Sequence, residues 1–186
     1  KSISDLDFNA EKDKKIPFYV NEFLKGKELV DIKYEQIWNE SPLPHENPEN
    51  AFRVIEGDFV TTEDGTGIVH TAPTFGADDA RVAKLANPPI PALLILDKNN
   101  QLVPLVNLQG KFVDELGFLG GKYVKNEYYE KNEVPEKSVD VEIAIKLKEE
   151  NRAFKVEKYV HSYPNCWRTD KPILYYPLDS WFIKVT

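Results

Sequence analysis

Proline placement limits how long any regular element of this chain can be. Thirteen prolines are spread over 186 residues, and each lacks an amide hydrogen and fixes φ, so a helix or central strand ends near it. Three fall within residues 39–50, which we therefore expect to be a loop. Pro88, Pro89 and Pro91 must stop any helix that precedes them. The chain is expected to fold from short elements joined by many turns.

Between these turns, the pattern of apolar residues predicts several short strands and two helices. Spacings of three and four at residues 139–151, and acidic side chains at the beginning of residues 78–86, predict helices. These elements together predict an α+β fold with a small β-barrel core and peripheral helices. The expected strands are residues 30–35, 52–55, 58–61 and 68–71, a hairpin of residues 92–96 with residues 101–106, and a strand with Phe154, Val156 and Val160 on one face.

Composition excludes several classes of protein. No apolar run approaches the roughly 18 residues of a membrane span, so we expect no membrane partner. The net charge of −7 argues against an autonomous nucleic-acid binder held by phosphate contacts, although it leaves room for a local basic strip. The single cysteine permits neither an internal disulfide nor a multi-cysteine zinc site. These features favour an intracellular protein, and we expect a cytoplasmic one.

Residues 1–15 are mostly charged or polar, which predicts a flexible arm before a domain of residues 16–186. Because the sequence contains no methionine, we expect a processed chain or a piece of a longer protein.

The densest group of unusual residues is Gly65 to Asp79, which reads G-T-G-I-V-H-T-A-P-T-F-G-A-D-D. Two glycines permit a tight turn, His70 lies near the end of a strand, and two carboxylates begin a helix. A pocket with an imidazole on one wall and a carboxylate on the other would suit an ammonium ligand. The structural alternative is a common turn, a helix-capping Asp78 and a histidine that only makes a hydrogen bond.

A second group, residues 161–172, reads H-S-Y-P-N-C-W-R-T-D-K-P. Aromatic rings interleaved with basic side chains can stack on or neutralise a single-stranded end of a nucleic acid. Alternatively, Trp167 is a core residue and Arg168 pairs with Asp170. The basic residues of this region are Lys155, Lys158, Arg168 and Lys171.

Two further chemistries remain open. A metal-dependent hydrolase would use His70 with Asp78 or Asp79, but the histidines lack a local ligand pair such as H-x-x-x-H, and no metal site is assigned. A nucleophilic Cys166 would need a base, and His161 lies five residues earlier.

The two groups together resemble the editing domain of isoleucyl-tRNA synthetases, an insertion in the Rossmann-type catalytic domain. The motifs are G-T-G-[IVA]-V-H-x-A-P-x-x-G-x-D-D at residues 65–79 and H-S-Y-P-x-C-W-R at residues 161–168. Phe75 and the loop lengths are closer to the eukaryotic-like branch of the family. The family's threonine-rich peptide, T-T-T-P-W-T, is absent, so we expect a fragment that is weakly active or inactive alone.

The resemblance implies a β-barrel fold and post-transfer editing, in which a positioned water hydrolyses the ester of mischarged Val-tRNA(Ile). An aminoacylation pocket built for isoleucine cannot strongly reject a side chain one methylene smaller, as is known for this family. The catalytic residues implied are Asp79, which would hold the α-ammonium, and His70, which would orient the ester or the terminal adenosine. The substrate-binding residues implied are Gly67, Thr71, Ala72, Phe75 and Asp78.

The partners implied are the tRNA(Ile) acceptor end carrying valine and the remainder of the synthetase, to which the chain returns near residue 186. The basic residues of the second group are expected to contact the tRNA. No cofactor is expected here, whereas the parent enzyme is expected to use ATP and Mg²⁺. The signatures of the catalytic domain, His-x-Gly-His and Lys-Met-Ser-Lys-Ser, are absent. The alternative within the same family is a non-catalytic module that docks the acceptor end.

Overall fold

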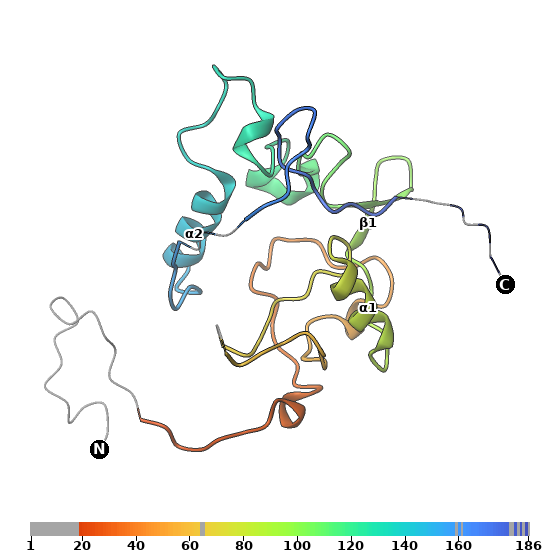
Figure 1. Cartoon of the computed structure of the whole chain (residues 1–186), viewed down its shortest axis with the longest axis vertical. Helices are drawn as coiled ribbons and strands as arrows, with labels where there is room; N and C mark the ends of the chain where they lie inside the picture. Colours follow the sequence, from red (N-terminus) through yellow and green to blue (C-terminus); the bar gives the residue numbers. More distant parts are fainter. Residues whose placement is uncertain are drawn as a thin grey trace, which may run out of the picture.

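A computed structural model describes residues 19–63, 66–158, 160, 162–178, 181, 183 and 185 of the chain. Within these residues the regular elements are two α-helices, one two-stranded sheet and several 3₁₀ turns, so helix and antiparallel sheet are mixed as in an α+β fold (Figure 1). The arm predicted at residues 1–15 lies outside the described residues. Helices and strands are α1 (Ala77–Leu85), β1 (Leu94–Leu96), β2 (Leu102–Pro104) and α2 (Val139–Glu149).

The hairpin predicted around residues 97–100 is confirmed. β1 and β2 pair antiparallel, with Ile95 opposite Val103. The carboxylate of Asp97 accepts hydrogen bonds from the backbone N–H groups of Asn99 and Gln101, each at 2.8 Å. The bond from Gln101 is the main reason that the pKa of Asp97 is lowered. A side chain therefore closes the turn between the strands.

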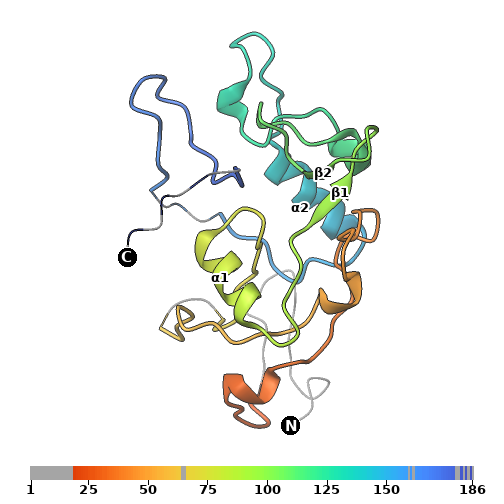
Figure 2. The same cartoon turned by 90° about the vertical axis from the view of Figure 1, so that its right-hand side faces the viewer.

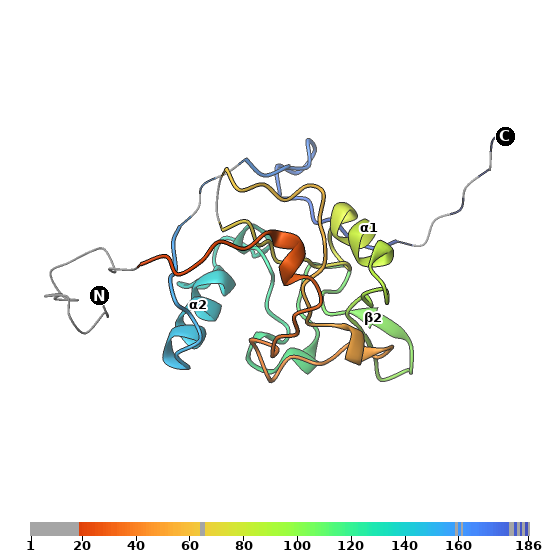
Figure 3. The same cartoon turned by 90° about the horizontal axis from the view of Figure 1, so that it is seen from below.

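Both predicted helices are confirmed to within two residues at each end. In α1, Val82 and Ala83 are buried, and the prolines that follow end the helix as expected. In α2, Val139 is buried at the N-terminus. The two helices lie apart, on different sides of the molecule (Figures 1 and 3). Among the described residues, no helix is long and apolar enough to cross a membrane.

The main hydrophobic core forms where the hairpin meets the N-terminus of α2 and the 3₁₀ segment Asp114–Leu119. Trp38 and Phe112 are among the half-buried residues that pack against it, and the rings of Trp38 and Phe118 lie 5.1 Å apart. Because this core is small, contacts outside it must hold the remaining loops. The buried core residues are Ile95, Leu105, Leu116, Leu119 and Val139.

The described residues form no closed β-barrel, so the predicted barrel core is not supported. Residues 30–35 and 52–55, each predicted as a strand, meet only through an isolated bridge between Lys33 and Arg53. Asp31 and Phe52 have positive φ angles of 66° and 55°, which interrupt an extended strand on each side of that bridge. Residues 58–61 and 68–71 are not strands, and neither are the described residues 154–158 and 160. A barrel needs a continuous ladder of hydrogen bonds, and these breaks prevent one.

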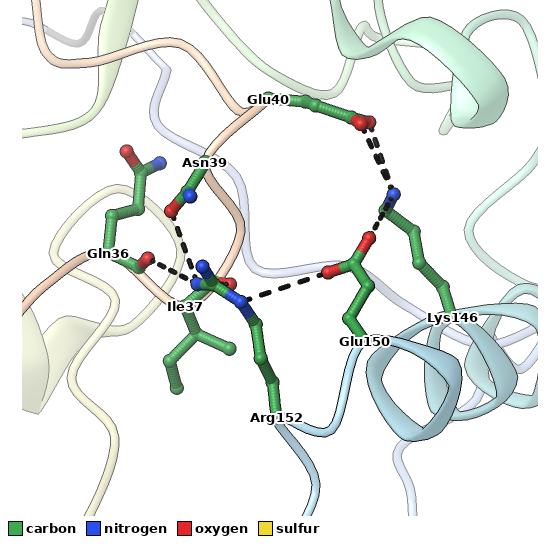
Figure 4. A network of polar contacts seen from close by, with 7 residues as sticks. All are labelled: Gln36, Ile37, Asn39, Glu40, Lys146, Glu150 and Arg152. Atoms are coloured by element: carbon green, nitrogen blue, oxygen red, sulfur yellow. Dashed lines mark hydrogen bonds and ion pairs between the residues drawn. The ribbon is translucent and has the colours of Figure 1, made fainter.

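A network of polar side chains joins the C-terminal end of α2 to the segment around residue 37 (Figure 4). Arg152 donates to the backbone carbonyl of Ile37 at 2.6 Å, and Lys146 pairs with Glu150 at 2.6 Å and with Glu40 at 3.3 Å. A single exposed ion pair contributes about 0–1 kcal/mol. Here several donors share acceptors from segments more than 100 residues apart, so the network fixes where α2 lies.

A second connection depends on Arg53, which is only 8% exposed. Its guanidinium donates to the carboxylate of Asp31, to the carbonyl of Pro88, and to the carbonyl of Asn50 at 3.4 Å. These acceptors come from three separate segments, one of which follows α1. Arg53 therefore ties the end of α1 to the rest of the N-terminal half.

Arg53→Met, which keeps a long side chain but removes every donor, is expected to lower the free energy of unfolding by about 2 kcal/mol. Asp31→Asn should cost less than about 1 kcal/mol, because that side chain is 65% exposed and water replaces its partner. Urea denaturation of the two variants measures both values. Equal losses in the two variants would contradict this assignment.

Candidate functional site

The segment between residues 66 and 76 carries most of the predicted site residues, and it begins with a tight turn. The hydroxyl of Thr66 accepts a hydrogen bond from the N–H of Ile68 at 3.3 Å. Gly67 has a φ of +73°, a conformation that favours glycine, as the motif predicted. His70 follows with its side chain exposed. Gly65, the first residue of the motif, lies outside the described residues.

The carboxylate of Asp79 folds back from the first turn of α1 onto this segment. Its Oδ2 atom accepts a hydrogen bond from the N–H of Ala72 at 2.9 Å. A Cβ atom at Gly76 would lie 2.7 Å from that oxygen, so the missing side chain leaves the space that the carboxylate occupies. The sequence predicted an acidic helix start. The structure adds that Asp79 and Ala72 are held together.

Two contacts fix the middle of the segment. Thr74, only 8% exposed, accepts a hydrogen bond from the N–H of Leu93 at 3.0 Å and so ties the segment to the residues before β1. The ring of Phe75 lies 6.0 Å from that of Tyr176. Sequence reasoning did not single out Thr74 or Tyr176, because both partners are distant in the chain and no local pattern links them.

Asp78 has a different environment from Asp79. It is exposed and lies 3.7 Å from Arg81, whose guanidinium also pairs with Asp58 at 2.5 Å. The hydrogen bond from Arg81 lowers the pKa of Asp58. Asp78 thus belongs to a surface group of charges. Among the described hydrogen bonds and ion pairs, none joins Asp78, Asp79 and His70 to one another.

Two surface hollows of about 260 and 400 Å³ lie elsewhere. The first is mainly between residues 46–50 and 89–94, and the second is between residues 97–99 and 107–115. None of the predicted site residues lines either hollow. Within the described part of the chain, no three His, Cys, Asp or Glu side chains are grouped to hold a metal.

The second predicted group folds into a hydrogen-bonded loop of residues 164–173, which we name the Trp167 turn. Asn165 and Pro172 form a bridge, and the N–H of Cys166 donates to the carbonyl of Lys171 at 2.8 Å. Trp167 is 86% exposed, so its interpretation as a core residue is wrong. The guanidinium of Arg168 lies 4.7 Å from the centre of the Trp167 ring. Arg168 thus faces an aromatic ring, whereas the sequence alternative paired it with Asp170.

The other residues of this group are less constrained. Lys155 pairs with Glu157 at 2.6 Å on the surface, and Lys158 is exposed. The pKa of the Cys166 thiol is lowered, chiefly by a hydrogen bond from the Thr169 side chain. The proposed base for this thiol, His161, lies outside the described residues.

Comparison with known proteins identifies relatives along almost the whole chain. Isoleucine–tRNA ligase of Cytophaga hutchinsonii is 56% identical over 195 aligned positions that cover 98% of this chain. The enzyme of Bacteroides fragilis is 52% identical over 94% of the chain, and that of Clostridium acetobutylicum is 42% identical over 90%. The chain is homologous to a segment of isoleucine–tRNA ligases. No family model matches it.

These isoleucine–tRNA ligases are aminoacyl-tRNA synthetases, and all are much longer than the chain described here. The chain spans about a sixth of the length of the first two, 17% and 16% respectively. The motif segment and the Trp167 turn therefore both lie in a chain that matches one part of these longer ligases.

The contact between Asp79 and Ala72 predicts a specific energetic coupling between Gly76 and Asp79. Gly76→Ala should push the carboxylate off the Ala72 amide and lower the free energy of unfolding by about 1 kcal/mol, and Asp79→Ala should cost about the same. Since both changes break the same contact, the double variant should lose less unfolding free energy than the sum of the losses in the two single variants. Urea denaturation of the wild type, the two single variants and the double variant measures this double-mutant cycle. Strictly additive losses of unfolding free energy would contradict the predicted coupling.

A second prediction concerns Cys166. Thr169→Val removes the hydroxyl that lowers the pKa of the thiol, so that pKa should rise towards its ordinary value. Because the thiolate is the reactive form, alkylation at neutral pH should slow, and its pH midpoint should move upward. Thr66→Val, which removes a hydroxyl from a different turn, serves as the control. An unchanged midpoint for Thr169→Val would refute the assignment.

Proposed function

We propose that this segment is the post-transfer editing domain of an isoleucine–tRNA ligase and hydrolyses the ester of Val-tRNA(Ile). The observation that carries the proposal is the H-T-A-P-T-F-G-A-D-D motif of residues 70–79 in a chain homologous to a segment of these ligases. We assign residues 16–186 to this domain and residues 1–15 to an arm. Phe75 and the loop lengths are the basis for placing it in the eukaryotic-like branch.

Asp79 is the proposed anchor for the α-ammonium of the mischarged valine. Oδ2 already accepts a bond from Ala72, yet a carboxylate has two oxygens and about four acceptor positions, which leaves capacity for an ammonium. The bond to Ala72 would hold the carboxylate in one orientation before substrate binds, which lowers the entropic cost of recognition. Asp79 in this account both shapes the loop and binds the substrate.

The remaining residues would position the ester. Exposed His70 would orient the ester or the terminal adenosine, while Gly67, Thr71 and Ala72 would line the cavity for a small side chain together with Phe75. A positioned water would add to the carbonyl carbon, and the bond to the ribose oxygen would break. That oxygen would take up the proton that the attacking water gives up and become the free hydroxyl, and valine would leave as its carboxylate after loss of its own proton to solvent.

The wider setting is also proposed. Partners would be the acceptor end of tRNA(Ile), contacted by the basic residues of the second group, and the rest of the ligase in the cytoplasm. ATP and Mg²⁺ would bind elsewhere in the parent enzyme, because this chain lacks the catalytic-domain signatures. The family's threonine-rich peptide is not in this sequence, so the full-length ligase is the appropriate material for activity tests.

Asp79→Asn in the full-length ligase separates the two roles of this side chain. Asparagine keeps the size of the side chain and an oxygen that can accept from Ala72, but it lacks the charge that holds an ammonium. We expect deacylation of Val-tRNA(Ile) to fall at least about tenfold, with aminoacylation by isoleucine unchanged. Retained deacylation in Asp79→Asn would show a purely structural role and refute the proposal.

Two alternatives are distinguished by simple measurements. A non-catalytic docking module would bind the tRNA acceptor end without deacylating Val-tRNA(Ile) at any enzyme concentration. A metal-dependent hydrolase that uses His70 with Asp78 or Asp79 would lose activity in a chelator. Deacylation that persists in EDTA, and that depends on the charge of Asp79, favours the editing function over both.

A further inference from the structure

We propose that Trp167 stacks on an unpaired nucleotide of the bound tRNA and that Arg168 and Lys171 contact its phosphates. This inference rests on the tRNA partner of the proposed function, but it requires no hydrolysis. It assigns a ligand class, single-stranded RNA, to one exposed side chain.

The exposure of Trp167 is the first observation. A tryptophan is the side chain with the most apolar surface to bury, and here 86% of it faces solvent. The backbone that presents it is well fixed: Asp170 N–H donates to the carbonyl of Cys166 at 2.8 Å, and Ile173 N–H donates to that of Pro164 at 3.0 Å. A fixed turn with an exposed indole at its tip is an arrangement suited to a stacking partner.

The Trp167 turn is also anchored to the body of the molecule. The hydroxyl of Tyr128 donates to the carbonyl of Pro172 at 2.7 Å, and Lys125 lies 4.9 Å from the centre of the Tyr163 ring. Figure 2 shows the turn, in blue, projecting away from both helices. The indole is therefore held at a defined place outside the core, where a large ligand can reach it.

Charge decides between RNA and a protein partner. The Arg168 guanidinium lies over the Trp167 ring at 4.7 Å, and Lys171 is exposed in the same turn. The turn thus carries two cations, Arg168 and Lys171, and one carboxylate, Asp170, so it is locally positive in a chain whose net charge is −7. Sites for single-stranded nucleic acid combine an aromatic ring that stacks on a base with cations that neutralise the backbone. A surface for an apolar protein partner would not need those cations.

The test measures equilibrium binding of uncharged tRNA(Ile) to the full-length ligase. Trp167→Ala should weaken binding about 5- to 100-fold, the range expected for loss of one stacked base, whereas Trp167→Phe should retain most of the affinity. The same transcript trimmed of its unpaired 3′ end should bind the wild type and Trp167→Ala equally. Phe23→Ala removes another exposed aromatic, 92% exposed and in the N-terminal part, and should change nothing.

Two results would overturn the inference. One is unchanged affinity of Trp167→Ala for the intact transcript; if the melting temperature of that ligase is also lower, the indole packs against another part of the enzyme. The other is an equal loss of affinity for intact and trimmed transcripts, which would exclude stacking on the unpaired end. Because no assay depends on ester cleavage, a failed editing hypothesis would not produce any of these results.

Discussion

Single side chains that bond to distant backbone groups hold this molecule in shape. Among the described residues, the hydrogen-bond ladders between strands are short, because prolines and residues with positive φ interrupt them. The buried core is a small cluster beside the hairpin. Arg53 donates hydrogen bonds to three segments, and Arg152 bonds the chain after α2 to the carbonyl of Ile37. The carboxylate of Asp79 accepts a bond from the N–H of Ala72. The loop that carries the candidate site depends on the last of these contacts.

The same carboxylate has the geometry that the proposed binding role needs. Before a ligand arrives, Asp79 has one oxygen committed to the backbone and other acceptor positions open. Gly76 provides the space, and Thr74 ties the middle of the loop to the chain before β1. A negative charge is thus held in place at the N-terminus of a helix, where the helix dipole favours it. The editing site proposed above would use this preorganised charge to bind an ammonium.

The two motif segments differ in how they present their residues. The segment of residues 66–79 is partly buried, and the carboxylate of Asp79 bonds to its own backbone at Ala72. The Trp167 turn instead exposes its largest side chain to solvent. A hydrolytic site benefits from the first arrangement, because positioning lowers the barrier. A surface that accepts RNA benefits from the second. The proposals for the two segments are compatible in one ligase but rest on different contacts.

Local patterns determined the helices, the β1–β2 hairpin and the two motifs. Helix periodicity, proline stops and an Asp that closes a turn act within a few residues, so the sequence alone shows them. Tertiary structure decided the rest: that residues 30–35 and 52–55 meet in one bridge without forming a barrel, that Trp167 is exposed, and that Phe75 lies beside Tyr176. Each of these depends on partners more than a dozen residues away, or on a φ angle set by the fold, and no local pattern of residues records such partners.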